Sequence, residues 1–256
     1  MKIMRNISKK IIGLFMFCGV CTHLSAQEAD IKAAETAYAS EMYDRAIELY
    51  ESVVKTYGDS FALYYNLGNA YYKTGKIAHA ILNYERALLI KPGDSDIRFN
   101  LEMAKQKTVD KIEPLQEFFL NKWFRSVQNL IAVDLWATIG IVCFVLFIFC
   151  LVLFFFSKWM RLKKFGFYMG ILLLVAVIFA NIFAYNQKEE LINRNGAIVF
   201  SPTVTVKSSP DNSGTDLFVL HEGTKVFIRS TVGDWNEITL EDGNIGWINK
   251  KDITII

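Results

Sequence analysis

Two long uncharged runs that lie close together constrain the fold of this chain more than any other feature. Leu135–Phe156 contains 22 residues without a charged side chain, and Gly166–Tyr185 contains another 20. A helix needs about 20 apolar residues to cross the hydrocarbon core of a bilayer. Lipid offers no partner to backbone polar groups, so each run must be helical. Both runs are apolar on every side, which argues against a hairpin buried in a soluble protein. We therefore expect a two-helix transmembrane hairpin.

The segment between the two runs predicts the orientation of the hairpin. Residues 157–165 include four basic side chains and no acidic one: Lys158, Arg161, Lys163 and Lys164. Short loops that are rich in lysine and arginine stay in the cytoplasm. We therefore expect a cytoplasmic tip, with both flanking parts of the chain on the opposite side of the membrane.

Residues 1–26 have the layout of a secretory signal peptide. A basic n-region is followed by the apolar run Ile11–Val20, which is too short to span a membrane, and by the small residue Ala26. Cleavage after Ala26 is the expected processing. A lipoprotein reading at Cys21 is the weaker alternative, because the bulky Val20 precedes the cysteine. Export of the following residues agrees with the orientation of the hairpin.

Charge and motif content exclude several classes of function. The net charge is +2, and its basic surplus lies in the leader and in the loop, so we expect no nucleic-acid partner. The sequence shows no metal-ligand spacing, P-loop, nucleophile elbow or dinucleotide fingerprint. The two apolar runs contain no acidic residue, which is unlike a transporter. We expect no enzymatic activity, no cofactor and no metal.

Residues 27–111 contain an internal repeat of 34 residues. The segments AIELYESVV and AILNYERAL align at this offset, which pairs Ala46 with Ala80. The second unit is the fuller one and contains Tyr64, Leu67, Gly68, Tyr71, Gly75, Ala80, Tyr84, Ala87 and Pro92. This pattern resembles the tetratricopeptide repeat, a pair of antiparallel helices. Gly68 and Ala80 are small where the helices must approach closely, and Gly75 suits the turn between them.

The resemblance implies a groove for a protein partner on the face formed by the first helices of the units. The family's groove positions correspond here to Ile31, Glu35, Tyr38, Tyr65, Asn69, Tyr72 and Lys73, with Phe99 and Met103 added by a capping helix over residues 96–107. The alternative for each is ordinary packing between helices. About three repeats are needed for a continuous core, so this short array is expected to lean on the membrane or on a partner.

Residues 112–134 form a bridge between this domain and the first span. After Glu113-Pro114 the apolar residues follow a helical spacing and leave a polar side that includes Lys122 and Arg125. The bridge is therefore expected to be an amphipathic helix. It lies either in the membrane interface or packed under the repeat domain.

After a linker at residues 186–192, residues 193–256 change to a period of two. The expected strands are Ala197–Phe200, Thr203–Lys207, Leu217–Leu220, Lys225–Ser230, Asn236–Leu240, Ile245–Ile248 and Ile253–Ile256. Turn residues separate them, which predicts a small all-β barrel. The motif residues Val204, Val206, Ser208, Pro210, Gly223, Trp235, Gly246, Trp247 and Ile248 resemble the bacterial SH3 domain.

Relatives of that domain bind cell-wall peptides or proteins, or serve as structural units. The resemblance therefore makes Trp235 and Trp247 candidates for a ligand shelf. The alternative is that at least one of these tryptophans belongs to the core of a small barrel.

The fold class expected for the whole chain is a multidomain membrane protein: an all-α tetratricopeptide-repeat domain, the hairpin, and an SH3-like barrel. This order of parts resembles the E-protein family of the Bacteroides aerotolerance operon. The resemblance implies an inner-membrane protein, and the charge rule makes both domains periplasmic. The resemblance also implies a gene encoded together with von Willebrand A-domain membrane proteins, which are candidate partners, and a MoxR-type ATPase. The implied role is in oxidative-stress tolerance or envelope complex assembly.

Three hypotheses follow. The first is a membrane-anchored scaffold whose groove holds a protein partner. The second is an envelope sensor whose SH3 domain binds cell-wall peptide, that is, peptidoglycan. The third makes both domains spacers for a hairpin that assembles with other membrane helices through small faces such as Gly166 and Gly170.

Overall fold

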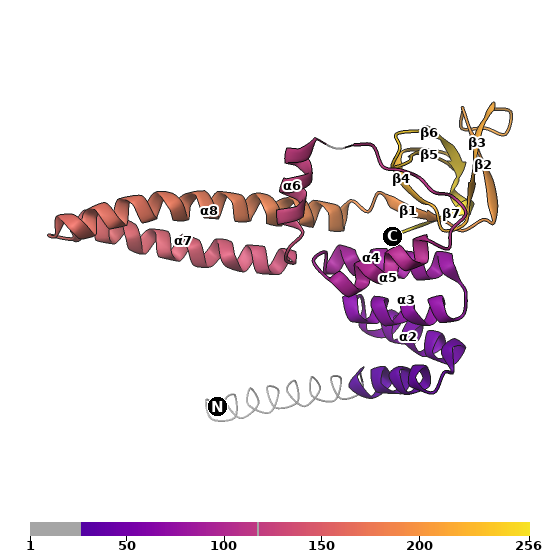
Figure 1. Ribbon diagram of the computed structural model, residues 1–256, viewed down its shortest axis with the longest axis horizontal. Helices are drawn as coiled ribbons and strands as arrows, with labels where there is room; N and C mark the ends of the chain where they lie inside the picture. Colours follow the sequence, from indigo (N-terminus) through magenta and orange to yellow (C-terminus); the bar gives the residue numbers. More distant parts are fainter. Residues whose placement is uncertain (1–26, 117) are drawn as a thin grey trace, which may run out of the picture.

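The computed structural model describes residues 27–116 and 118–256, and the predicted leader lies outside them. The chain forms a helical domain, a long helical hairpin and a C-terminal β-sheet domain (Figure 1). The two domains lie together at one end of the hairpin, which projects away from them (Figure 1).

The helical domain consists of successive antiparallel helices. They are a helical segment over residues 27–39, α2 (Tyr43–Tyr57), α3 (Phe61–Lys73), α4 (Ile77–Ile90) and α5 (Ser95–Lys105). A Cβ atom at Gly68 would lie 2.6 Å from Cε1 of Tyr84, so α3 and α4 touch where the sequence predicted a close approach. Gly75 has a φ of +78° in the turn between these helices, a conformation that favours glycine.

The C-terminal domain is a seven-stranded antiparallel sheet. The strands are β1 (Gly196–Val199), β2 (Thr203–Lys207), β3 (Asp216–His221), β4 (Lys225–Val232), β5 (Trp235–Thr239), β6 (Ile245–Asn249) and β7 (Ile253–Ile255). Their order in the sheet is β3-β2-β6-β5-β4-β1-β7. Alternating residues such as Val206, Ile238 and Ile248 fill its core. The all-β prediction for this part of the chain is thus confirmed as an antiparallel sheet.

The two domains share one hydrophobic cluster, in addition to the separate core within the sheet domain. Ile198 and Ile256 of the sheet domain belong to the same buried cluster as the helices of the repeat domain. Phe200 meets the His79 ring of α4 edge-on, with 4.8 Å between ring centroids. A Cβ atom at Gly223, which has a φ of +86°, would lie 2.7 Å from Cγ2 of Thr108. The short helical array therefore gains cover from the sheet domain of its own chain, whereas the repeat count predicts cover by the membrane or by a partner.

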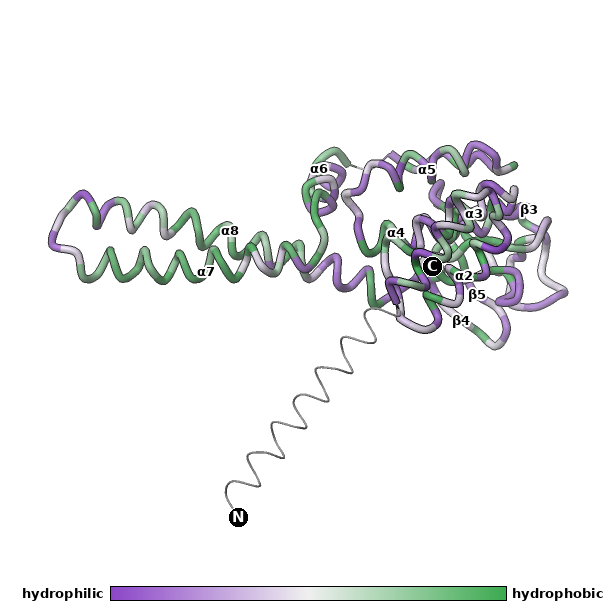
Figure 2. The backbone as a smooth tube through the Cα atoms, turned by 90° about the horizontal axis from the view of Figure 1, so that it is seen from below, coloured by the Kyte–Doolittle hydropathy of each residue, from purple (hydrophilic) through white to green (hydrophobic). Residues whose placement is uncertain are grey.

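The hairpin consists of α7 (Val133–Phe156) and α8 (Met160–Ile192), joined by residues 157–159. Both helices are long and apolar enough to cross a membrane. Figure 2 shows that both helices are largely hydrophobic and that the tip where they join is hydrophilic. Arg161, Lys163 and Lys164 lie on the first turns of α8 and not in a nine-residue loop, and α8 continues through the predicted linker. The apolar signal marks residues that suit lipid, whereas the helix extends further because polar residues also form helices.

The small residues of the hairpin face its own partner helix. A Cβ atom at Gly166 would lie 2.8 Å from the carbonyl oxygen of Cys150, and one at Gly170 would lie 3.7 Å from the Cys150 Cβ. These two glycines allow α7 and α8 to pack closely. They therefore face the partner helix within the hairpin and do not form the free face for other membrane helices that the third hypothesis named.

The bridge is helical over only part of its length. The backbone N–H of Leu115 donates to the carbonyl of Glu241 at 3.0 Å, so this stretch runs along the sheet domain. The helix α6 covers Phe119–Gln128. Its Phe124 ring packs on Phe183 of α8, with centroids 4.8 Å apart. The hydrogen bond to the sheet accounts for the non-helical backbone at Leu115, where the periodic pattern predicted a helix.

Candidate functional sites

The first helices of the successive units surround an open cavity of about 270 Å³. Its lining residues are Tyr38, Asn69, Tyr72, Lys73, Tyr84, Phe99, Asn100 and Met103. They come from the helical segment over residues 27–39 and from α3, α4 and α5. The cavity therefore lies on the face where the repeat pattern predicts a groove, and we call it the groove below.

A hydrogen-bond network forms the floor of the groove. The Asn69 Oδ1 atom accepts from the Tyr84 hydroxyl at 2.8 Å and from Asn100 Nδ2 at 2.9 Å. Asn100 Nδ2 also donates to the Tyr65 hydroxyl at 3.1 Å. Burial raises the pKa of Tyr84, so its hydroxyl stays protonated and remains a donor. The network fixes the side chain of Asn69 between three helices.

The walls of the groove are aromatic and apolar, with basic groups at the edge. Phe99 is 66% exposed and Met103 is 38% exposed, although both are apolar. The Nζ atom of Lys107 lies 4.1 Å from the centroid of the Tyr72 ring. Lys73 lines the same cavity and is exposed. Such a surface offers apolar contact, amide hydrogen bonds and positive charge, which suits reversible binding of a polypeptide.

The structure brings together most of the predicted groove residues. Tyr38, Asn69, Tyr72 and Lys73 line the cavity, as do the added residues Phe99 and Met103. Tyr65 contributes its hydroxyl to the floor. Glu35 and Ile31 are not among the lining residues; Glu35 is exposed, and Ile31 packs against the core.

Asn100 was missed by the sequence reasoning, although a signal for it existed. It lies 34 residues after Asn66, which is the period of the repeat. Asn100 therefore occupies, on the first helix of the third unit, the position that Asn66 occupies in the second unit.

The two candidate tryptophans lie next to each other on one face of the sheet. Trp235 pairs with Asn249, and Trp247 pairs with Glu237, so the two tryptophans are diagonal neighbours on β5 and β6. Their immediate neighbours Asn236 and Ile248 point to the opposite, buried side. Both tryptophans are half-buried and neither belongs to the buried core of the domain. The structure therefore differs from the alternative that placed at least one of them in the core.

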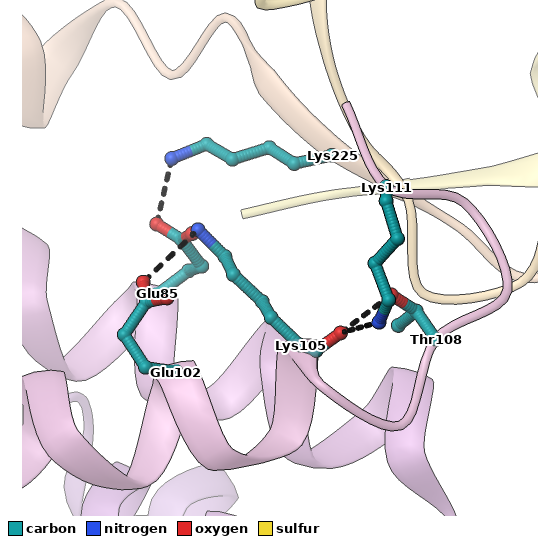
Figure 3. A network of polar contacts seen from close by, with 6 residues as sticks. All are labelled: Glu85, Glu102, Lys105, Thr108, Lys111 and Lys225. Atoms are coloured by element: carbon teal, nitrogen blue, oxygen red, sulfur yellow. Dashed lines mark hydrogen bonds and ion pairs between the residues drawn. The ribbon is translucent and has the colours of Figure 1, made fainter. Parts of the chain in front are cut away.

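A buried charge cluster lies between the helical domain and the sheet (Figure 3). The Glu85 side chain is 9% exposed, and its Oε2 accepts from Lys225 Nζ at 2.7 Å. Lys105 Nζ lies 3.6 Å from Oε1 of the same carboxylate. Burial by itself would raise the pKa of Glu85, but the two ammonium groups outweigh it and lower the pKa. Glu85 therefore stays ionised in the interface.

Asp110 joins the end of the helical domain to the sheet in a similar way. Its Oδ2 accepts from the backbone N–H of His221 at 2.7 Å and from the Thr224 hydroxyl at 2.6 Å, and its Oδ1 lies 2.8 Å from His221 Nδ1. Burial opposes ionisation of Asp110, but these donors dominate and lower its pKa. Sequence reasoning found neither cluster, because the partners lie more than 100 residues apart.

Comparison with known proteins identifies one part of the chain. The tetratricopeptide repeat family matches residues 61–94, which include α3 and α4. A search of curated proteins found no match. Tetratricopeptide repeats generally mediate binding between proteins and are not catalytic modules, and no enzyme family is indicated for this chain.

Proposed function

We propose that this protein is a scaffold anchored in the bacterial inner membrane, whose groove holds a protein partner in the periplasm. The observation that carries the proposal is the groove itself. A matched tetratricopeptide repeat supplies Asn69 and Tyr72, and its neighbours supply exposed apolar walls such as Phe99. A rigid hydrogen-bonded floor beneath exposed aromatic side chains is typical of a preorganised contact surface.

The hairpin supports the membrane part of the proposal. Its side chains are apolar and mostly exposed, for example Ile141 at 67% and Phe155 at 68%, which in water would be strongly unfavourable. The basic residues gather at the tip, whereas both domains lie at the other end (Figure 2). The rule that basic segments stay in the cytoplasm supports our proposal that both domains are periplasmic.

The order of the parts supports a more specific proposal. It resembles the E-protein family of the Bacteroides aerotolerance operon, with a bacterial SH3 domain in the sheet region. From this resemblance we propose partners among von Willebrand A-domain membrane proteins and a role in oxidative-stress tolerance or in an envelope complex.

Photo-crosslinking and substitution in the groove test the scaffold. A photoreactive residue at Tyr72 of the full chain in intact cells is expected to give a discrete protein adduct, identifiable by mass spectrometry. The pair Tyr72→Ala and Phe99→Ala is expected to abolish co-purification of that protein. Met42→Ala is the control, because Met42 is 54% exposed and apolar but does not line the groove. If the double variant is folded and still co-purifies with that protein to the same extent, the groove assignment is contradicted.

A second candidate function is binding of cell-wall peptide, and the tryptophan pair favours it. Trp235 and Trp247 form an aromatic surface on the outer face of the sheet. The test uses the full chain, because Ile198 and Ile256 share a core with the helices and an isolated sheet domain would lose that cover. Retention on purified peptidoglycan is expected to fall in Trp235→Ala with Trp247→Ala. It is expected to persist in the control Val219→Ala, because Val219 is an apolar residue of β3 that is 47% exposed. Absence of retention in the unsubstituted chain would count against this function.

A further inference from the structure

We propose that the apolar face of α6 is a lipid-binding surface, which lies in the membrane interface of the leaflet beside the two domains. The inference rests on the proposed membrane crossing of α7 and α8. It assigns a second contact with the bilayer, outside the hairpin, that fixes the height of the domains above the membrane.

The helix α6 has large apolar side chains that the described part of the chain leaves at least half exposed. Phe119 is 68% exposed, Leu120 is 51% exposed and Trp123 is 64% exposed. Phe118, directly before the helix, is 62% exposed. Burial of apolar surface is favourable, so an aqueous location for all of these side chains would be unfavourable.

The opposite face of α6 is mostly polar and faces a cavity beside α8. Asn121, Arg125 and Gln128 follow one another at one-turn spacing and line a cavity of about 500 Å³ between α6 and α8. The other lining residues include Asn186, Glu189 and Glu190 of α8. The polar side of α6 therefore faces the part of α8 that follows its apolar run.

Two contacts with α8 fix the depth of α6 along the hairpin. Phe124 packs on Phe183, which lies within the apolar run, whereas the polar side meets Asn186 and Glu189, which lie beyond it. Phe183 and Asn186 lie within one turn of each other on α8. Helix α6 therefore crosses α8 where the apolar run ends and polar residues begin. Figure 1 shows α6 running across the direction of the hairpin. The apolar face lies on the side of α6 away from this cavity, at the level where the apolar run of α8 ends.

Buried hydrogen bonds hold α6 in this orientation. The carbonyl oxygen of Gln128 accepts from Trp136 Nε1 of α7 at 2.8 Å and from Gln187 Nε2 of α8 at 2.6 Å. Gln128 is 3% exposed and Gln187 is 4% exposed. With its C-terminal end bound to both helices of the hairpin, α6 cannot turn its apolar face toward the domains. Lipid is the occupant that we assign to this face, because Phe124 of α6 packs on Phe183 within the apolar run of α8, which places α6 at the level where the proposed span meets the membrane surface.

Lipid photo-crosslinking tests the proposal with matched probes. The full chain is reconstituted in phosphatidylethanolamine–phosphatidylglycerol vesicles with a photoreactive residue at Phe119, at Asn121 on the polar face of α6, or at Leu146 on α7. Lipid adducts are measured by mass. We expect adducts at Phe119 in an amount similar to Leu146 and several-fold above Asn121.

The three probes separate the possible failures. Adducts at Leu146 without adducts at Phe119 would overturn the lipid surface and leave the membrane crossing intact. An adduct at Phe119 with a second copy of the chain, in place of lipid, would also overturn it. Adducts at neither position would contradict the membrane crossing on which the inference rests. Because Phe119 and Leu146 are exposed, replacing them leaves the cores of both domains unchanged.

Discussion

The Glu85 carboxylate on α4 lies 2.7 Å from the Lys225 ammonium on β4, a residue 140 positions later in the chain. The carboxylate is almost fully buried between the helical domain and the sheet. A buried charge whose partner is removed costs several kcal/mol, because water cannot replace the partner. The two domains therefore depend on each other for stability and are expected to unfold as one unit.

Removal of one partner of this pair is the first prediction. We expect Lys225→Met to lower the free energy of unfolding by about 1–3 kcal/mol, since Lys105 remains at 3.6 Å from the carboxylate. Denaturant unfolding of the full chain in detergent, followed by circular dichroism and tryptophan fluorescence, measures the change. Lys207→Met is the control, because its partner Asp216 is 67% exposed and such a pair contributes about 0–1 kcal/mol. Equal losses in the two variants would contradict the interface account.

Gly68→Ala provides a second prediction whose sign is informative. In an open helix interior this change stabilises by about 0.8–1 kcal/mol, because alanine has the higher helix propensity. Here the new Cβ would lie 2.6 Å from Cε1 of the buried Tyr84 ring. We therefore expect a net loss of about 1–3 kcal/mol in the free energy of unfolding. A stabilised variant would show that α3 and α4 do not approach as closely as the structure indicates.

The third prediction concerns the pH dependence of the domain interface. The His79 ring lies 4.8 Å from the rings of both Tyr71 and Phe200. Burial lowers the pKa of His79 below its ordinary value of 6.5, and Lys76 lowers it further, while Glu51 and Glu222 oppose the shift. The folded protein thus favours the neutral ring. Its contribution to stability is complete above the ordinary pKa and is lost as the pH falls through the lowered pKa.

Unfolding at a series of pH values measures this dependence. Between about pH 7.5 and pH 5 we expect the free energy of unfolding to fall as the pH falls, and His79→Gln to flatten that slope. The carboxyls of Glu85 and Asp110 also have lowered pKa values, but their contribution is lost only at more acidic pH. A slope that His79→Gln leaves unchanged would assign the effect to other groups.

The helices, strands and turns could be predicted from local sequence patterns, because each pattern has a single physical cause. The repeat offset located α3 and α4 through Gly68 and Ala80, where close packing demands small residues. Alternation located strands such as β2 (Thr203–Lys207), whose bounds agree with the prediction. Turn glycines such as Gly75 and Gly223 have positive φ, which few other residues adopt.

The relation between the domains could not be predicted in the same way. Ile198 and Ile256 read as ordinary strand residues, yet they complete the core of the helical domain. Nothing local distinguishes Glu85 from a solvated helix residue, because its partner Lys225 is distant in sequence. For the groove, the repeat register predicted the lining residues Asn69 and Tyr72. It did not predict that Glu35 lies outside the cavity, since that depends on how the first helix sits against α3.

The floor of the groove supplies the last prediction. Asn69 and Asn100 are joined directly, and Asn69 also holds the Tyr84 hydroxyl. In a double-mutant cycle of Asn69→Ala and Asn100→Ala, we expect a coupling of about 0.5–3 kcal/mol in the free energy of unfolding. The control cycle pairs Asn69→Ala with Asn83→Ala, whose amide donates to the His79 carbonyl and shares no hydrogen bond with Asn69. Additive losses are expected there. Additivity in both cycles would mean that the two asparagines do not act together, and the groove would then lack the rigid floor on which its proposed role depends.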